Sequence, residues 1–274
     1  MRVFKPSAID RVWRLQAVCI CGAFLVLFAL PAGGQNAGRS LEEVLRRTGK
    51  LVEVFWQQFG EVNCSEAVSQ VRLDKKGKVI DRKESIFDYL VTLKVDGNDL
   101  LVEELRRAQF PARNSKNTPL LVTHGFSTLV LIFHPVYQGN FEYALLGEEV
   151  VEGRKLLRVR FRHVSGFRSP SVLQLRGRDY PLDLQGTAWI EPGTGAIARI
   201  EAGLTASMED IGLRVFRSDV RYAPMSFKDA PQVYWLPVGA EMEAETPRQH
   251  WRHVHRFTNY KRFSATMRIE PIEK

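Results

Sequence analysis

A side-chain period of two is the sequence feature that most constrains the fold. From Phe87 to Val95 aromatic and aliphatic residues occupy every second position, and the positions between them are mixed or polar. Between Leu157 and His163 the alternation is sharper, since every intervening residue is an arginine. Because successive side chains of a strand point to opposite faces, both stretches predict strands with one apolar face. A sheet built from such strands must be covered on that face by other elements.

Turn residues separate these strands from their neighbours. Asp96-Gly97-Asn98 and Pro192-Gly193-Thr194-Gly195 are strong hairpin signals, and Glu152-Gly153 supplies a shorter turn. Short links of this kind imply that consecutive strands are antiparallel. The predicted strands cover residues 62–73, 83–95, 100–107, 140–149, 154–164, 186–191, 196–206, 213–222, 234–243 and 250–268.

Two segments have the pattern of helices. Ser40 and Glu43 form a capping box ahead of apolar residues at helical spacing, which predicts a helix from Leu41 to Phe59. The apolar residues 125–134 fit either a short helix or a buried strand, and we favour a short second helix that Pro135 ends. The predicted fold class is therefore α+β: a curved antiparallel sheet, an incomplete β-barrel, wrapped around the N-terminal helix and the short second helix.

The N-terminal residues have the three parts of a secretory leader. Four arginine and lysine residues precede an apolar run over residues 15–30, and small residues follow it. We expect residues 1–34 to be a signal peptide and residues 35–274 to form a single domain that is periplasmic or secreted. An uncleaved leader would instead anchor the domain in the inner membrane. Cys64 is the only cysteine after residue 34, so no internal disulfide is expected in the mature domain.

Composition and motifs exclude several classes of function. The chain carries a formal charge of +8, which fits either solubility or contact with anionic headgroups and acidic glycans, so peripheral membrane contact stays open. The sequence has no phosphate-binding loop and no dinucleotide fingerprint. An exported domain of this kind is expected to bind no nucleic acid and no cofactor.

Histidines and acids are present, but they form no recognisable catalytic or metal motif. His253 and His255 share one face of the last predicted strand, while His250 lies on the other. Zinc requires three or four ligands, and arginines flank these histidines, so we expect an exposed basic strand without metal. His124 and Ser127 permit a hydrolase as the third and least favoured function. We predict a protein that is not an enzyme and has no catalytic residue.

Apolar and basic side chains supply the candidate ligand-binding residues. Alternate residues from 196 to 206 form a stripe of mostly small side chains, which would admit either a closely packed helix or a cavity for an acyl chain. The segment 165–185 is predicted to be a long irregular loop whose arginines can meet an anionic headgroup. The candidate wall residues are Phe141, Tyr143, Trp189, Ile200 and Trp235, and the candidate headgroup residues are Arg168, Arg176 and Arg178.

The hairpin at residues 186–200, with an aromatic strand, an acid, a glycine-containing turn and a second strand, resembles a known family. It is similar to the central hairpin of the LolA-like periplasmic lipoprotein-carrier superfamily, which includes RseB-like sensor domains. Residues 257–263 resemble the last strand of many such envelope proteins, and the order of elements also fits. The resemblance implies an incomplete barrel with an apolar cavity for acyl chains, and hence a non-enzymatic carrier or sensor of lipid or lipoprotein. The alternative is an envelope scaffold or protein-interaction module with a filled core, whose partner is an envelope protein.

Overall fold

The fold is seen in a computed structural model, which describes residues 33–96, 99–109, 125–175 and 178–263. Three helical segments and twelve strands are found in these residues. The elements are α1 (Gly33–Phe59), β1 (Val62–Leu73), β2 (Val79–Asp96), β3 (Asp99–Ala108), η1 (Phe126–Phe133), α2 (Pro135–Gln138), β4 (Phe141–Val151), β5 (Arg154–His163), β6 (Val172–Leu175), β7 (Arg178–Pro181), β8 (Leu184–Ile190), β9 (Ile197–Leu204), β10 (Val215–Ser226), β11 (Val233–Glu245) and β12 (His250–Arg262).

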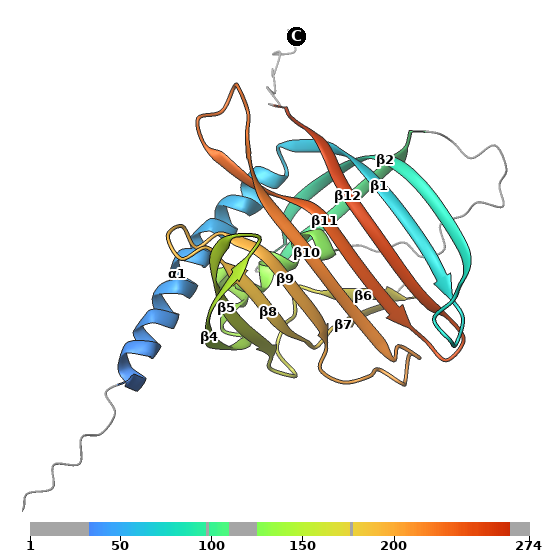
Figure 1. Cartoon of the computed structure of the whole chain (residues 1–274), viewed down its shortest axis with the longest axis horizontal. Helices are drawn as coiled ribbons and strands as arrows, with labels where there is room; N and C mark the ends of the chain where they lie inside the picture. Colours follow the sequence, from blue (N-terminus) through green and yellow to red (C-terminus); the bar gives the residue numbers. More distant parts are fainter. Residues whose placement is uncertain (1–32, 97–98, 110–124, 176–177, 264–274) are drawn as a thin grey trace, which may run out of the picture.

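Ten strands form one antiparallel sheet in the order β3-β2-β1-β12-β11-β10-β9-β8-β5-β4 (Figure 1). In the described chain two pairs of neighbouring strands are not consecutive in sequence, β5 with β8 and β1 with β12, and the latter two pair along most of their length. The strand order ends at β3 and β4, so the sheet is not closed into a barrel. This arrangement confirms the predicted fold class of a curved antiparallel sheet around helices.

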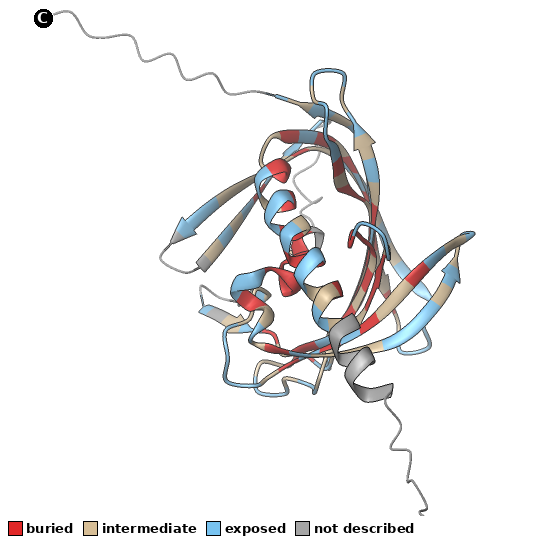
Figure 2. Cartoon of the chain, turned by 90° about the vertical axis from the view of Figure 1, so that its left-hand side faces the viewer, coloured by how far each residue is buried: buried red, intermediate tan, exposed pale blue. Residues whose placement is uncertain are grey.

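The sheet curls around α1 and η1, which lie on its hollow side (Figure 2). We call this side of the sheet the inner face and the opposite side the outer face. Because side chains alternate along a strand, the cross-strand register assigns each residue to one face. The predicted helix over residues 41–59 is found within α1, whose buried Val52, Phe55 and Phe59 point toward the sheet.

The second predicted helix is found at the expected residues, but it is a 3-10 helix and a separate short helix follows it. Residues Leu129 to Phe133 of η1 are at most 4 % exposed, which makes this short 3-10 helix the most deeply buried segment of the cover. Gly125 precedes η1 with φ of 84°, a left-handed conformation that glycine adopts without strain. Pro135 does end η1, but it then begins α2, which His134 caps by accepting a hydrogen bond from the Val136 amide.

Two local features set which residues of β8 and β9 reach the inner face. A Cβ atom on Gly186 would lie 1.8 Å from the carbonyl oxygen of Glu201, so only glycine fits at this close approach of β8 to β9. A bulge between Trp189 and Ile190 skips Ala198 in the pairing, which brings Ile197 next to Ile190. The expected small-residue stripe is therefore interrupted at Ala198, which packs with Trp189 instead.

Other predictions are corrected or lie outside the described residues. The segment 165–185 is not irregular throughout, because β6 and β7 form a two-stranded hairpin within it. Residues 1–32 are outside the described part of the chain, so the leader and its cleavage stay predictions. In the described residues no helix is long and apolar enough to cross a membrane.

Candidate functional site on the inner face

The inner face of β4, β5 and β8 to β10 is apolar. The register places Val159, Ala188, Ile200 and Val220 side by side across four strands, and none of the four is measurably exposed. These side chains face η1 and α1 and form the main hydrophobic core. An apolar surface of this extent on an open sheet is stabilised only while something apolar covers it.

An aromatic corner joins β4 and β5 to η1. The ring of Phe133 lies 5.2 Å from that of Tyr143 and 5.9 Å from that of Phe161. The Tyr143 hydroxyl donates a hydrogen bond to the carbonyl oxygen of Ile132 at 2.6 Å. Burial raises the pKa of Tyr143 well above its usual range, so the hydroxyl stays protonated and remains a donor. Tyr143 thus holds η1 against the inner face.

Two hollows lie between the cover and the sheet, and the larger one, of about 250 Å³, lies between α1 at Val44 and the sheet residues Leu157 and Ile190. A mainly apolar cavity of about 40 Å³ lies between α1, η1 and the sheet, and Phe55, Val130, Tyr222 and Trp235 are among its lining residues. A volume of this size has room for one or two water-sized groups. In the state described, α1 and η1 therefore fill the inner face around this small cavity, whereas the larger hollow beside Val44 stays free.

The inner face changes character at β1, β3 and β12, where charged groups are buried. Arg106 on β3 donates to Glu66 Oε2 at 2.6 Å and to Glu104 Oε2 at 2.7 Å. His255 Nδ1 lies 2.8 Å from Glu66 Oε1, and Glu104 Oε1 accepts a hydrogen bond from the Gly125 amide. We call these four side chains, Glu66, Glu104, Arg106 and His255, the buried ionic cluster. Through Gly125 the cluster reaches the start of η1.

Electrostatics keep Glu66 and Arg106 charged despite their burial. Burial disfavours the ionised form of Glu66, but hydrogen bonds from His255 and Arg106 outweigh it and lower the pKa of this carboxyl. Burial likewise opposes the charge on Arg106, whereas Glu66 and Glu104 raise its pKa. The guanidinium also lies over the ring of Tyr89, which contacts Phe59 of α1. The ionic cluster is thereby continuous with the apolar cover.

His253 extends the polar surface toward β11. It is fully buried, and its Nδ1 lies 3.4 Å from the Gln70 side-chain amide, while its Nε2 has no hydrogen-bond partner in the described chain. Burial lowers the pKa of His253 to about 4, and His255 adds to the effect. The expectation of an exposed basic terminal strand is therefore wrong for His253 and His255, because β12 is the central partner of β1 and β11.

The structure brings together part of the predicted wall. Phe141, Tyr143 and Ile200 lie on the inner face, and Trp235 borders the small cavity near α1. Trp189 lies on the outer face, opposite Arg158 and Arg199, where its indole donates to Glu149 and the Arg199 guanidinium covers its ring. Its assignment as an inner wall residue is corrected, because the β8 register turns Ala188 and Ile190 inward instead.

The three predicted headgroup arginines are not grouped by the structure. Arg168 is exposed in the connection between β5 and β6, and Arg178 is exposed at the first position of β7. Arg176 lies outside the described residues. A role for these arginines in headgroup binding remains a prediction.

Sequence reasoning missed the ionic cluster, because its members are far apart in sequence and form no motif. One signal was available: Glu66 occupies an inward position between the apolar Cys64 and Val68 of β1. A charged residue on the buried face of a strand requires a buried partner. Within the described part of the chain, no three histidine, cysteine or acidic side chains gather as metal ligands.

Comparison with known proteins shows similarity in fold. No protein-family model and no curated protein sequence matches the chain. Among solved structures it is similar to a LolA superfamily protein from Nitrosomonas europaea, with 11 % identity, a TM-score of 0.38, and 82 % and 94 % of the two chains covered. It is also similar to a DUF1329 family protein from Desulfovibrio piger, with 14 % identity, a TM-score of 0.40 and 82 % and 95 % coverage. A third is a putative outer membrane lipoprotein-sorting protein domain from Vibrio parahaemolyticus, with 9 % identity, a TM-score of 0.37 and 85 % and 94 % coverage.

A LolA superfamily protein, the kind of protein that the hairpin at residues 186–200 resembles, is thus among the solved structures to which the chain is similar.

Proposed function

We propose that the protein is an exported, non-enzymatic binding protein that holds the acyl part of an amphipathic ligand, a lipid or lipoprotein, on the inner face of its sheet. The observation that carries the proposal is the nature of the cover. An extended apolar face is closed, in the described chain, by one amphipathic helix and by the apolar η1. The basic and apolar leader supports export to the periplasm or beyond.

The cover η1 is suited to exchange with a ligand. A 3-10 helix has poorer hydrogen-bond geometry than an α-helix, and Thr128 breaks this one with φ of −107° and ψ of 16°. Side chains outside η1 bind its backbone at Ile132, Phe133 and Val130, through Tyr143, Gln138 and Tyr222, and Glu104 binds the Gly125 amide just ahead of it. Replacing its apolar side chains by an acyl chain conserves the burial of the sheet and requires these bonds to be released.

Ligand entry on this proposal requires movement of the cover. The cavity of about 40 Å³ is too small for an acyl chain, so a ligand that binds there must displace α1 or η1, and the hollow of about 250 Å³ beside α1 is a place where such a ligand can begin to enter. A ligand stabilises such a state by the difference between its affinities for the two forms. The carboxylates of Glu66 and Glu104 are bound by Arg106, and Glu66 also by His255, which supports a binding role over a catalytic one.

The test is native mass spectrometry of the mature domain, purified without detergent from an exporting host and then extracted with organic solvent. We expect a co-purifying or added acyl species to bind the wild type, and Trp235→Leu at the cavity to weaken that binding. Trp189→Leu, a matched change on the outer face, is the control and should retain the ligand. A clean apo mass with no gain on adding phospholipid or acylated peptide would overturn the proposal.

That outcome would favour the second candidate, an envelope interaction module with a filled core. The small size of the inner cavity is the observation in its favour. The wild type would then be expected to bind a protein partner with α1 and η1 unchanged in their hydrogen-exchange protection.

A further inference from the structure

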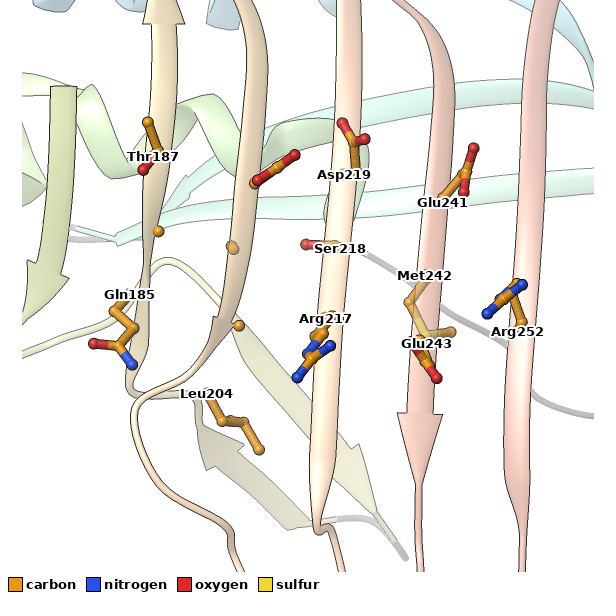
Figure 3. A pocket seen from close by; sticks show the side chains of 14 residues that line it. Gln185, Thr187, Leu204, Arg217, Ser218, Asp219, Glu241, Met242, Glu243 and Arg252 are labelled. Atoms are coloured by element: carbon orange, nitrogen blue, oxygen red, sulfur yellow. The ribbon is translucent and has the colours of Figure 1, made fainter. Parts of the chain in front are cut away.

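Opposite charges on the outer face are paired between neighbouring strands. Figure 3 shows Arg217, Glu243 and Arg252 on β10, β11 and β12, and Glu243 lies directly opposite both arginines in the register. Glu142 on β4 likewise lies opposite Arg162 on β5. Unlike charges that lie directly opposite each other stabilise a strand pair, so this pattern joins strands that are neighbours.

The edge strand β3 carries charges of both signs, but among the described residues only β2 pairs with it. Its residues 103–107 read Glu-Glu-Leu-Arg-Arg, with two acids, a central leucine and two arginines. The signs of the charges are exchanged when this segment is read backwards. A second copy that lies antiparallel to β3 therefore offers an arginine wherever the first copy has an acid.

The backbone of β3 has hydrogen-bonding groups on its open side. The Gln109 amide, one residue past β3, donates to the Ile86 carbonyl of β2 at 2.9 Å, so odd-numbered residues bond to β2 and even-numbered ones point away from it. The Leu100 amide follows this alternation, because it donates to the Tyr137 hydroxyl of α2 at 3.3 Å. Past that contact, three residues direct their amide and carbonyl groups to the open side: Val102, Arg106 and Ala108.

We propose that two copies of the chain associate by antiparallel pairing of their β3 strands about a two-fold axis at Leu105. In this register Glu103 lies opposite Arg107 of the second copy, and Glu104 lies opposite Arg106 of the second copy. The nearest registers that keep each face on its own side are shifted by two residues, and they place Glu104 opposite Glu104 or Arg106 opposite Arg106. The register centred on Leu105 is therefore the one that gives each acid of the segment an arginine.

The outer face of β3 supports this register. Leu105 is 52 % exposed, and in the dimer it contacts its own counterpart across the axis. Glu103 pairs with Lys94 and Arg107 pairs with Asp88, each at 2.8 Å, yet more than half of the Glu103 and Arg107 side chains stays exposed. Across the interface these ion pairs join into one row of alternating positive and negative charge.

A buried donor on the inner face supports the same register. The Nε and Nη2 groups of Arg106 bind Glu66 and Glu104, whereas Nη1 is buried and has no hydrogen-bond partner within the described ranges. A buried donor without an acceptor is destabilising. In the dimer the Glu104 carboxylate of the second copy lies next to this guanidinium and can accept the missing bond.

A cysteine at the axis tests the register directly. Position 105 pairs with itself as a non-hydrogen-bonded pair, in which the Cα atoms are about 4.5 Å apart, within the range that a disulfide spans. We expect Leu105→Cys in the mature domain to give a covalent dimer on mild oxidation. Leu101→Cys, a leucine of β3 that is 43 % exposed, is the matched control. It should stay monomeric, because the two copies of position 101 are about 27 Å apart in this register.

Charge reversal tests whether both copies use the same segment. Glu103→Arg and Arg107→Glu each place like charges opposite each other twice, so we expect each to weaken self-association about tenfold in sedimentation velocity. An equimolar mixture of these two variants has unlike charges at both positions and should recover a dimer with one copy of each. Glu148→Arg on β4, the other edge strand, is the control and should leave self-association unchanged.

Three outcomes would overturn the proposal. The first is a wild-type domain that remains monomeric at about 1 mM. The second is equal loss of association in Glu148→Arg, which would indicate an open-ended contact of β3 with β4 of the next copy. The third is a disulfide in Leu101→Cys as readily formed as in Leu105→Cys. These variants change outer-face side chains, so they should retain any acyl ligand of the inner face, and this proposal and the proposed function fail independently.

Discussion

His255 Nδ1 and Glu66 Oε1 lie 2.8 Å apart although 189 residues separate them in sequence, and both side chains are almost completely buried. The pair joins β12 to β1, the two strands that close the chain's ends into one sheet. Arg106 completes the arrangement from β3, so one carboxylate connects three strands. The stability of this part of the sheet therefore depends on Glu66 staying charged.

Neutralising Glu66 should be strongly destabilising. Glu66→Gln removes the charge that Arg106 and His255 bind, and leaves a buried guanidinium with less compensation. We expect the free energy of unfolding to fall by about 3–5 kcal/mol, as measured by urea denaturation. Glu103→Gln, in an exposed pair with Lys94, is the control and should change it by less than about 1 kcal/mol. Equal effects of both changes would mean that the buried ionic cluster contributes no more to stability than an exposed ion pair does.

Stability should fall with acid in a window set by His253. Its pKa is lowered from 6.5 to about 4, so between these values the unfolded chain binds more protons than the native one. The contribution of His253 is thus complete above pH 6.5 and is lost as the pH falls toward 4, by roughly 3 kcal/mol in total.

Chemical denaturation at pH 7.5, 5.5 and 4.5 measures this loss. His253→Gln, which replaces the imidazole by an amide that does not titrate, should flatten the pH dependence in the same window. A wild-type curve that is level between pH 6.5 and 4.5 would contradict the assignment. Glu66 has a lowered pKa as well, so its contribution disappears only at lower pH, as the pH falls through its native value.

Removing the Tyr143 hydroxyl should loosen η1. Tyr143→Phe leaves the buried Ile132 carbonyl without this donor, at a cost of about 1–2 kcal/mol. We expect hydrogen-exchange protection to drop first in residues Leu129 to Phe133. Tyr180→Phe on β7 is the control, since the Tyr180 hydroxyl makes no hydrogen bond within the described part of the chain. Unchanged protection of η1 would show that packing alone holds it.

Gly186 should tolerate no side chain. In Gly186→Ala the new Cβ would lie 1.8 Å from the Glu201 oxygen and 2.8 Å from the Phe161 ring, so β8 and β9 must separate. We expect the free energy of unfolding of the domain, measured by thermal denaturation, to fall by about 3 kcal/mol or more. Gly139→Ala should be nearly neutral, because no atom lies within 4 Å of the place that its new Cβ would take. A stable Gly186→Ala variant would contradict the close approach of β8 to β9 at this position.

Local patterns in the sequence determined the elements and the fold class. The alternation over residues 87–95 predicted β2, and the helical spacing after Ser40 predicted residues 41–59 of α1. The capping box did not mark the helix start, because α1 already begins at Gly33 and the Glu43 carboxylate binds Arg46 and Arg47. Each of these signals lies within one element, where backbone geometry alone decides which side chains share a face. The short turns then restricted the topology to antiparallel neighbours, which the sheet order confirms.

The tertiary structure decided which of these faces carry function. Pairing of β1 with β12 buries His253 and His255 beside Glu66, and no local pattern contains that contact. A single bulge at Trp189 changed which residues of β9 lie inside, because one extra residue shifts the alternation by one. Sequence spacing describes one strand at a time, whereas burial and cross-strand charge depend on which strands become neighbours.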